Sequence, residues 1–250
     1  MGARLAGKAA IITGAGSGFG AGMARRFAEE GCHVLVADLD PAGAEGVATE
    51  IGELATPFCA DVSLSDNVSS MVETAMAQFG KVDILVNNAG YSHINGSLLD
   101  VTDDEFDRIT NVNMKAIYLA AKAIVPHMRD NGGGTILTTA STAGLRPRPG
   151  LTWYNASKGW TITATKSMAV ELAGDGIRVN CLCPVAGETG MLSTFMGEDT
   201  PEVRARFQSV IPLGRFSTPL DIANAALWLV SDEAAFITGV ALEVDGGRCI

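Results

Sequence analysis

The sequence lacks any long hydrophobic run and any apolar leader. No apolar stretch among its 250 residues reaches about 18, the length that a membrane-spanning helix needs. Residues 1–6 carry no apolar segment of the kind found in a secretory signal. We therefore expect no membrane span and a cytoplasmic protein.

Cysteine is scarce, with five in the chain. Cys181 and Cys183 are two residues apart on an expected strand, so they share one face. No third and fourth ligand stands nearby at the spacing of a zinc site, and we expect no metal. An odd count without a secretory signal favours a reducing cytosol and buried thiols. A redox or metal-binding role for the pair is the alternative.

Positive charge is in the minority, because 18 Lys and Arg face 28 Asp and Glu, for a net charge of −10. An acidic surface repels phosphate backbones, so we expect no nucleic-acid partner. Charged residues make up 18% and apolar residues 47%, which indicates a globular chain rather than a disordered one.

Short apolar runs alternate with helical patterns along the whole chain. The expected strands are 9–13, 33–38, 57–61, 82–87, 135–141, 178–184 and 240–245. The expected helices are 19–30, 42–52, 66–79, 103–129, 152–173 and 219–231, and residues 102–105 resemble a capping box. The continuous Val, Ile and Leu indicates strands buried on both faces of a parallel sheet. Repeated strand–helix units predict a doubly wound α/β fold.

No linker divides the chain, so we expect one domain over residues 1–250. The longest segment outside the alternation is 188–212, and its Met, Leu and Phe residues make it too apolar for an idle surface loop. We interpret it as a mobile lid of short helices over a substrate. A structural insertion is the alternative.

A glycine-rich turn, TGAGSGFG over residues 13–20, follows the first strand and opens the first helix. Gly14 permits the sharp turn, and Gly18 and Gly20 allow close backbone approach. Free N–H groups and the positive end of the helix dipole attract a pyrophosphate there. This context favours a dinucleotide site over a glycine turn without a ligand.

Asp38 ends the second expected strand, where a carboxylate can accept hydrogen bonds from the adenosine ribose. A 2′-phosphate would meet Asp38 and Asp40 as like charges, with no Lys or Arg beside them. Ser17 stands where an Arg could grip that phosphate. The sequence therefore predicts NAD rather than NADP. The alternative is that Asp38 only caps the following turn.

Taken in order, the motifs resemble the short-chain dehydrogenase/reductase family over essentially the whole length. They are the glycine turn, Asn87-Asn88-Ala89-Gly90, Asn113, Ser141 and Tyr154-Asn155-Ala156-Ser157-Lys158. The resemblance implies a Rossmann-like doubly wound, mainly parallel seven-stranded sheet with helices on both faces. It also implies a catalytic group of Asn113, Ser141, Tyr154 and Lys158, and a homotetramer.

The turn, Asp38 and the resemblance together indicate a set of cofactor-binding residues. They are Gly14, Ser17, Gly18, Phe19, Gly20, Asp38, Leu39, Asp61, Val62, Asn88, Ala89, Gly90, Tyr154, Lys158, Pro184, Gly187 and Thr189. One departure from the family pattern concerns local geometry. Pro184 and Thr189 keep their places, but Val185 replaces a Gly and Gly187 replaces a branched residue.

Tyr154 and Lys158 are four residues apart, so they lie on one face of the expected helix. A phenol with its ordinary pKa of about 10 is a poor base near neutrality. A cation about 4 Å away contributes roughly 1–4 kcal/mol, which lowers that pKa by roughly one to three units. We expect Tyr154 to act as general base in alcohol oxidation and as general acid in reverse. A purely structural pair is the alternative.

Two further residues complete the expected catalytic group. Ser141 ends the fifth strand, where its hydroxyl can hold the substrate oxygen against Tyr154. The resemblance implies that Asn113 holds a water that links Lys158 to solvent. A helical Asn that only faces solvent or bonds locally is the alternative.

The expected substrate residues are mostly apolar: Ser141, His93, Trp153, Met191, Leu192 and Phe195. Such a set suggests an apolar, ring-shaped small-molecule alcohol or ketone, although these side chains can equally pack on their neighbours. The segment 184–192 and the ending 244–250 are similar to those of NAD-dependent secondary alcohol dehydrogenases of the cyclohexanol or 1-arylethanol type.

Two other functions stay open. One is reduction of 3-oxoacyl thioesters on an acyl carrier protein, against which stand the acidic Asp38 and the lack of an obvious basic patch. The other is an NAD-binding sensor or scaffold on the same fold, because a fold does not fix a function. Such proteins commonly lose part of the catalytic set, whereas this chain keeps all four members.

Overall fold

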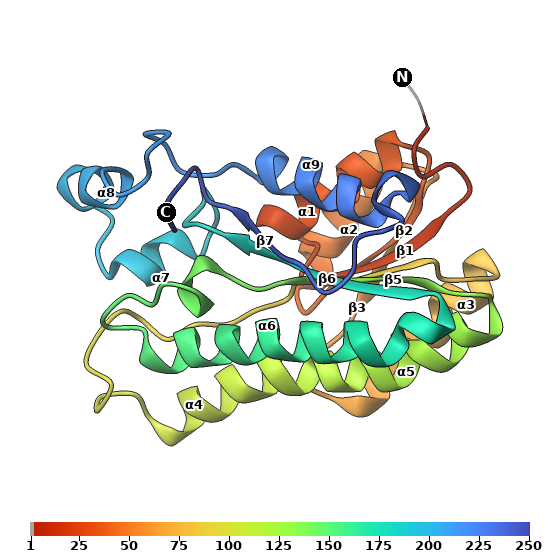
Figure 1. The fold of residues 1–250 in the computed structure, drawn as a ribbon, viewed down its shortest axis with the longest axis horizontal. Helices are drawn as coiled ribbons and strands as arrows, with labels where there is room; N and C mark the ends of the chain where they lie inside the picture. Colours follow the sequence, from red (N-terminus) through yellow and green to blue (C-terminus); the bar gives the residue numbers. More distant parts are fainter. Residues whose placement is uncertain (1–2) are drawn as a thin grey trace.

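Seven parallel strands form one sheet at the centre of the protein, in the order β3-β2-β1-β4-β5-β6-β7 (Figure 1). This computed structural model describes residues 3–250, so Met1 and Gly2 of the N-terminal segment considered above lie outside it. The strands are β1 Ala9–Thr13, β2 His33–Asp38, β3 Ala55–Cys59, β4 Ile84–Asn87, β5 Gly134–Thr139, β6 Ile177–Pro184 and β7 Ala241–Val244. All six neighbouring pairs are parallel.

Helices cover both faces of the sheet, which confirms the predicted fold class (Figure 1). One apolar layer joins the sheet to α1 Gly18–Glu29, α2 Pro41–Ile51 and α9 Pro219–Val230. The other joins it to α3 Ser65–Phe79, α5 Ala116–Asp130 and α6 Thr152–Leu172. Because both faces are buried, the strands are nearly all apolar, as the sequence pattern indicates.

The strand order reverses between β1 and β4, and this reversal positions the site. From β1 the chain runs outward through β2 and β3, and it then returns to add β4 on the other side. The loops that leave β1 and β4 therefore diverge to opposite faces and leave a crevice at the carboxyl ends of the strands. The glycine turn follows β1 at this point.

The third strand lies two residues earlier than the expected 57–61. Pro57 pairs with Val36 inside β3, although proline cannot donate a ladder hydrogen bond. β3 is an edge strand of the sheet, and an edge tolerates proline. The expected strand, which was based on the apolar run alone, therefore overlaps only residues 57–59 of β3.

The long helix expected at 103–129 is wrong as a single regular helix. It consists of α4 Asp103–Thr110, a π-helical segment Asn111–Lys115 and α5. The predicted capping box at its start is confirmed, because Glu105 N donates to Thr102 Oγ1 at 3.2 Å and Thr102 N donates to Glu105 Oε2 at 3.0 Å. The π-helical segment follows from tertiary hydrogen bonds described below.

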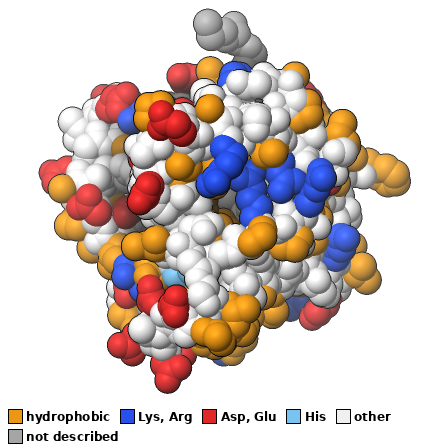
Figure 2. Space-filling model, turned by 90° about the vertical axis from the view of Figure 1, so that its left-hand side faces the viewer, with side chains coloured by type: hydrophobic (Ala, Val, Ile, Leu, Met, Phe, Trp, Pro, Cys, Tyr) orange, Lys and Arg blue, Asp and Glu red, His pale blue; other side chains and the backbone are white. Residues whose placement is uncertain are grey.

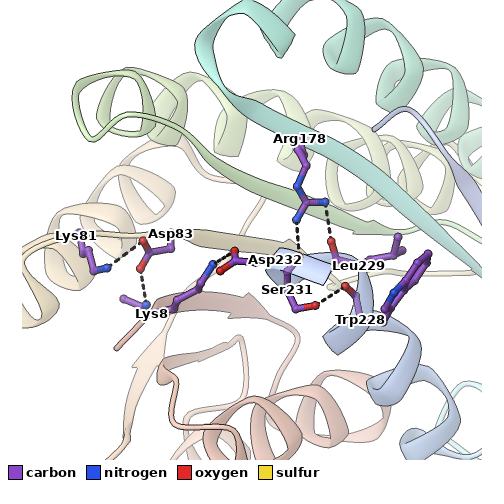
Figure 3. Close-up of polar contacts among 9 residues, drawn as sticks. Lys8, Lys81, Asp83, Arg178, Trp228, Leu229, Ser231 and Asp232 are labelled. Atoms are coloured by element: carbon purple, nitrogen blue, oxygen red, sulfur yellow. Dashed lines mark hydrogen bonds and ion pairs between the residues drawn. The ribbon is translucent and has the colours of Figure 1, made fainter. Parts of the chain in front are cut away.

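Polar contacts fasten the amino-terminal edge of the sheet, the edge away from the glycine turn (Figure 3). The Asp83 carboxylate accepts a hydrogen bond from Ala9 N at 2.8 Å, which joins the starts of β4 and β1. Arg178 of β6 donates to Leu229 O at 2.7 Å and to Ser231 O at 3.2 Å. The Arg178 guanidinium thereby caps the carboxyl end of α9.

The segment 188–212 folds into two short helices, α7 Leu192–Met196 and α8 Pro201–Gln208. Their apolar side chains form a small cluster with Val185, Ile211 and Phe216. Within residues 3–250, no helix has both the length and the hydropathy that a membrane crossing needs.

Candidate active site

A cavity of about 430 Å³ opens at the carboxyl ends of the strands, where the strand order reverses. One end of the cavity reaches the glycine turn and the tip of β2. The other end lies between the start of α6 and the helices α7 and α8. A pocket at this place in a doubly wound sheet is the expected location of a nucleotide and its reaction partner.

The structure brings most of the expected site residues together in the cavity lining. Those that line it are Gly14, Ser17, Gly18, Phe19, Asp38, Leu39, Asp61, Val62, Asn88, Ala89, Gly90, Ser141, Tyr154, Lys158, Pro184, Gly187, Thr189, Met191 and Phe195. Those that do not line it are Gly20, His93, Asn113, Trp153 and Leu192. The roles assigned to these residues stay predictions.

The glycine turn is shaped by close contacts that leave no room for side chains. Gly14 has a φ of 62°, and a Cβ there would lie 2.8 Å from Ala89 Cα. A Cβ on Gly20 would lie 2.1 Å from Gly14 O, so Gly20 faces the turn rather than the cavity. Gly20 therefore allows α1 to pack directly against the turn, and Gly14 and Gly18 form the surface of the cavity.

The Asp38 carboxylate both lines the cavity and holds the turn. Its Oδ2 accepts a hydrogen bond from Gly16 N at 2.8 Å, and its Oδ1 accepts one from Asp40 N at 3.0 Å. The capping role that was the alternative is thus present, and Asp38 also remains exposed to the cavity. The neighbouring lining residues Leu39, Asp61 and Val62 add no positive charge.

Asn88 links three strands beside the cavity. Its Nδ2 donates to Thr13 O and to Gly14 O, each at 3.0 Å. Its Oδ1 accepts a hydrogen bond from Thr139 Oγ1 at 3.1 Å. These bonds join the ends of β1, β4 and β5, so Asn88 fixes the position of the glycine turn relative to the end of β5.

Gly187 departs from the family pattern for a reason visible in the packing. A Cβ at this position would lie 2.4 Å from Cζ of Phe19 and 2.7 Å from Ser217 Oγ. The Phe19 ring of the glycine turn therefore occupies the space that a branched side chain at 187 would take. Phe19 and Gly187 are complementary, and both line the cavity.

Tyr154 and Lys158 lie in the first turns of α6, and both face the cavity. They are 6% and 5% exposed. Lys158 Nζ donates to Thr139 O at 2.8 Å and lies 5.7 Å from the centroid of the Tyr154 ring. Ser141 lies two residues after β5, outside the strand that was expected to end there, and its Oγ accepts a hydrogen bond from Ala143 N at 3.1 Å. The two expected reactive groups and the expected orienting hydroxyl thus share one wall.

Burial controls the proton affinities of this pair. It raises the pKa of Tyr154 to about 12, and a hydrogen bond with Ser141 offsets only part of that rise. Burial also lowers the pKa of Lys158 to about 8. In the polypeptide without its cofactor, the lowering of the phenol pKa that we expect from Lys158 is therefore outweighed, because burial disfavours the phenolate.

Asn113 is 2% exposed and lies in the π-helical segment behind the cavity. Its Oδ1 accepts a hydrogen bond from Tyr91 N at 2.8 Å, and its Nδ2 donates to Tyr91 O and to Ser157 Oγ, each at 2.9 Å. Asn113 thereby ties the loop after β4 to the catalytic helix. Both of its amide donors are committed to protein groups, which leaves its water-holding role a prediction.

The remaining expected substrate residues divide into two groups. Met191 and Phe195 line the cavity, and the Phe195 ring lies 5.1 Å from the Tyr154 ring. Trp153 instead turns away, with its Nε1 donating to Leu98 O at 3.2 Å. His93 is buried against its own loop, and Leu192 is buried in the cluster beneath α7.

The lining residues that sequence reasoning did not assign to the site include Tyr91, Arg108, Arg148, Asn155 and Phe207. Arg148 had a recognisable signal, because it stands between two prolines directly before the catalytic helix. The two prolines stiffen this segment and so fix the backbone of Arg148 close to the start of α6. Phe207 had no such signal, since only the fold brings α8 to this wall.

A dinucleotide fits the half of the cavity that is lined by the glycine turn and the tip of β2. The glycine turn presents backbone without side chains, and a Cβ on Gly18 would lie 3.2 Å from Thr189 Cγ2. The turn therefore offers a narrow, N–H-bearing cradle at the start of α1, which suits a pyrophosphate. Asp38 offers a carboxylate at the far end of the same surface, which suits a ribose diol.

Comparisons with known proteins add independent observations. The sequence model of a family described as enoyl-(acyl carrier protein) reductase matches residues 14–248. The chain is 50% identical to 4-formylbenzenesulfonate dehydrogenase TsaC1/TsaC2 of Comamonas testosteroni, over 96% of this chain and 97% of the relative. It is 40% identical to 2-(S)-hydroxypropyl-CoM dehydrogenase 3 of Xanthobacter autotrophicus, over 99% and 98%.

A solved structure is similar in both fold and sequence. It is the 3-ketoacyl-(acyl-carrier-protein) reductase from Brucella melitensis complexed with NADH. The TM-score is 0.94 and the identity 52%, with 98% of this chain and 100% of that chain covered. The prediction of a nicotinamide cofactor agrees with this complex.

Proposed function

The chain belongs to the short-chain dehydrogenase/reductase family of oxidoreductases, and we propose that it transfers a hydride between NAD and a secondary alcohol or its ketone. The observation that carries the proposal is the shared wall of Tyr154, Lys158 and Ser141. It faces the same cavity as the glycine turn and Asp38. An acid/base group and a dinucleotide cradle in one cavity suit hydride transfer coupled to proton transfer.

The chain's residues divide the work at the reacting oxygen. Tyr154 takes the alcohol proton in oxidation and returns a proton to the carbonyl oxygen in reduction. The Ser141 hydroxyl holds that oxygen against Tyr154. Lys158 supplies a buried positive charge, fixed by its bond to Thr139 O. We assign two roles to Asn113. It holds the start of α6 against the loop after β4, and it holds a water that links Lys158 to solvent.

When bound, NAD would accept the hydride in alcohol oxidation, and NADH would supply it in ketone reduction. Gly14, Ser17 and Gly18 would hold its pyrophosphate, Asp38 its adenosine ribose, and Thr189 its carboxamide. The lining beside Asp38 has no Lys or Arg to meet a 2′-phosphate, which supports NAD over NADP. The NADH complex of the Brucella relative supports the same choice.

The walls around Tyr154 support a cyclic or aryl-substituted substrate. Phe195, Met191 and Val185 line this part of the cavity, and Phe195 lies against the Tyr154 ring. Flat apolar walls favour a ring beside the reacting carbon. The Comamonas relative is named for an aromatic aldehyde that also carries a sulfonate.

Three further assignments belong to the same proposal. Residues 1–250 form a single catalytic domain, and α7 and α8 act as a lid that closes over the substrate. The protein works as a homotetramer in the cytoplasm. Sedimentation tests the assembly directly, because one subunit has a mass of 25.9 kDa.

Reduction of 3-oxoacyl thioesters is the second candidate. The name of the Brucella relative and the description of the matching family both favour it. Against it stand the absence of a 2′-phosphate site beside Asp38 and the apolar walls near Tyr154. A non-enzymatic NAD-binding protein is disfavoured because Asn113, Ser141, Tyr154 and Lys158 are all present.

A spectroscopic assay tests the proposal. The protein is incubated with NAD and with cyclohexanol, 1-phenylethanol and a straight-chain alcohol, and NADH absorbance is followed. An acetoacetyl thioester with NADH or NADPH serves in the reverse direction. We expect NADH from the cyclic and aryl alcohols. Faster turnover of the thioester with NADPH would transfer the assignment to the second candidate.

Two tyrosine variants separate chemistry from binding. Tyr154→Phe should lower kcat by about 10²- to 10⁴-fold, the contribution typical of a general acid or base, while NADH still binds. Tyr118→Phe is the matched control, because Tyr118 is exposed on α5 away from the cavity. Substantial activity in Tyr154→Phe would contradict the assignment.

A further inference from the structure

A positively charged group occupies the outer end of the cavity. Arg148 lines the cavity, and its guanidinium carbon lies 4.6 Å from the centroid of the Phe207 ring of α8. The backbone of Arg148 is held by Asn155, whose Nδ2 donates to Arg148 O at 2.8 Å. Asn155 directly follows Tyr154 in the catalytic helix. Arg148 is therefore fixed relative to the reacting end of the same cavity.

Arg148 has no acidic partner in the part of the chain that the structure describes. None of the ion pairs among residues 3–250 involves it or its neighbour Arg248. The carboxylate of Asp245, in the same C-terminal segment as Arg248, accepts hydrogen bonds from Gly247 N at 2.8 Å and Cys249 N at 2.7 Å.

A second arginine makes the unbalanced charge larger. Arg248 is 9% exposed, and its Nε has no hydrogen-bond partner among the described residues. Arg146 stands beside it, and its Nη1 donates to the backbone oxygens of Arg248 at 2.9 Å and Ile250 at 3.2 Å. Burial, together with the charge of Arg248, lowers the pKa of Arg148 to about 10. Two close guanidinium groups that form no ion pair among the described residues cost free energy that a bound anion would offset.

Basic side chains also gather on one face of the molecule. Figure 2 looks onto the side of the molecule that carries α8 and the C terminus in Figure 1. Lys and Arg side chains gather near the middle of that face, and acidic side chains lie mainly toward one flank. A local positive field in an otherwise acidic protein attracts small anions to that face.

We propose that the substrate carries a sulfonate or carboxylate group that binds Arg148 while its alcohol or carbonyl reaches Tyr154. This inference rests on the proposed function and narrows its substrate class. The planar guanidinium fork suits both oxyanions and can bind either in bidentate fashion. Phe195 at the reacting end and Phe207 at the arginine end line the space between, which suits an aromatic or other apolar body.

A matched set of substrates tests the inference. Para-sulfonated and para-carboxylated 1-phenylethanol are compared with the neutral para-methylsulfonyl compound, which has nearly the shape of the sulfonate. We expect kcat/KM to be about 10- to 100-fold higher for the anions, the range expected of a charge-assisted hydrogen-bond pair, and to fall with added salt. Equal values for the sulfonate and the sulfone would overturn the proposal.

Variants locate the effect at one side chain. Arg148→Gln should remove the preference for the anions, chiefly by raising KM for the anions far more than for the neutral sulfone. Arg148→Lys should restore part of the preference, because a point charge replaces the fork. Arg129→Gln is the matched control, since Arg129 is an exposed arginine that pairs with Asp175 beside the opposite edge of the sheet. An equal fall for all substrates in both Arg148 variants would show that Arg148 acts only on the fold, and would overturn the proposal.

A binding measurement separates this inference from the proposed function. Calorimetry compares benzenesulfonate with methyl phenyl sulfone on the protein with NADH, in wild type and in Arg148→Gln. Tighter binding of the sulfonate that is lost in the variant supports the anion subsite, even if no alcohol is turned over and the proposed function fails. Turnover of neutral alcohols with no preference for the sulfonate in either assay would defeat the subsite and leave the proposed function intact.

Discussion

The ionisation of Tyr154 is the property on which the proposed chemistry depends, and burial works against it. Its pKa rises from the ordinary 10.0 to about 12 in the polypeptide. At about 1.4 kcal/mol for each pKa unit, this rise corresponds to about 3 kcal/mol against the phenolate. Tyr154 therefore stays protonated throughout the neutral range, and a further positive charge is needed before it can act as a base.

The oxidised cofactor carries such a charge, whereas NADH does not. One positive charge at contact distance contributes about 4 kcal/mol at an effective dielectric of about 20. This exceeds the cost of burial, so NAD should lower the ionisation pH of Tyr154 by about two to three units. NADH, which fills the same cradle without that charge, should leave the ionisation near its value in the polypeptide.

The chain suits a direct titration, because it has only three tyrosines. Tyrosinate absorbance is recorded against pH for wild type and for Tyr154→Phe, each alone, with NAD and with NADH. Subtracting the variant removes the contributions of Tyr91 and Tyr118. We expect the Tyr154 signal only at strongly alkaline pH in the protein alone, and at clearly lower pH with NAD.

The ionisation of Tyr154 also determines how the rate of catalysis depends on pH. Oxidation uses the phenolate, so its rate at saturating NAD should rise with pH up to the ionisation seen in the titration. Reduction uses the phenol and should be favoured at lower pH. A Tyr154 signal below pH 10 in the protein alone would refute the argument from burial. Identical titrations with NAD and NADH would refute the assignment of Tyr154 as the base.

Two other predictions concern the cofactor half of the cavity. Replacing Asp38 with Ser and Leu39 with Arg should shift the ratio of kcat/KM for NADP to that for NAD upward by about 10- to 100-fold, because a repulsive carboxylate is exchanged for a phosphate-binding guanidinium; native activity that is already higher with NADP would contradict the argument. Gly187→Ala should weaken NADH binding by about 10-fold, since its Cβ would lie 2.4 Å from the Phe19 ring, and adding Phe19→Ala should restore much of that loss. Gly174→Ala is the control for the second prediction, because a Cβ at Gly174 meets no atom within 4 Å and Gly174 does not line the cavity.

The sequence predicts the sheet well because burial on both faces leaves a local signature. β1 and β2 are apolar runs bounded by a turn, and each has the expected limits. β3 breaks the pattern, because Pro57 is tolerated only where one side of a strand has no partner. Edge position is a property of the whole sheet, so the run of residues around Pro57 could not reveal it.

The π-helical segment shows a different limit. The residues 103–129 have the composition of a continuous helix, and no Gly or Pro marks the change at Asn111. The backbone register there accompanies hydrogen bonds from Asn113 to Tyr91 and Ser157, which come from other parts of the chain. Secondary structure that depends on such tertiary contacts leaves no periodic pattern in its own segment.

The residues of the candidate site also fall into those that a local motif predicts and those that only tertiary contacts bring together. The glycine turn and the pair Tyr154 and Lys158 are local motifs, so spacing alone predicts their shape. Arg148 and Phe207 meet only because α8 folds back over the start of α6, and Phe19 meets Gly187 only because β1 and β6 end at the same edge. The reaction is therefore encoded in short stretches of sequence, whereas the features that select the substrate arise where distant segments converge. On our proposal, substitutions at the arginine end of the cavity should therefore change the substrate preference of this protein without altering the chemistry at Tyr154.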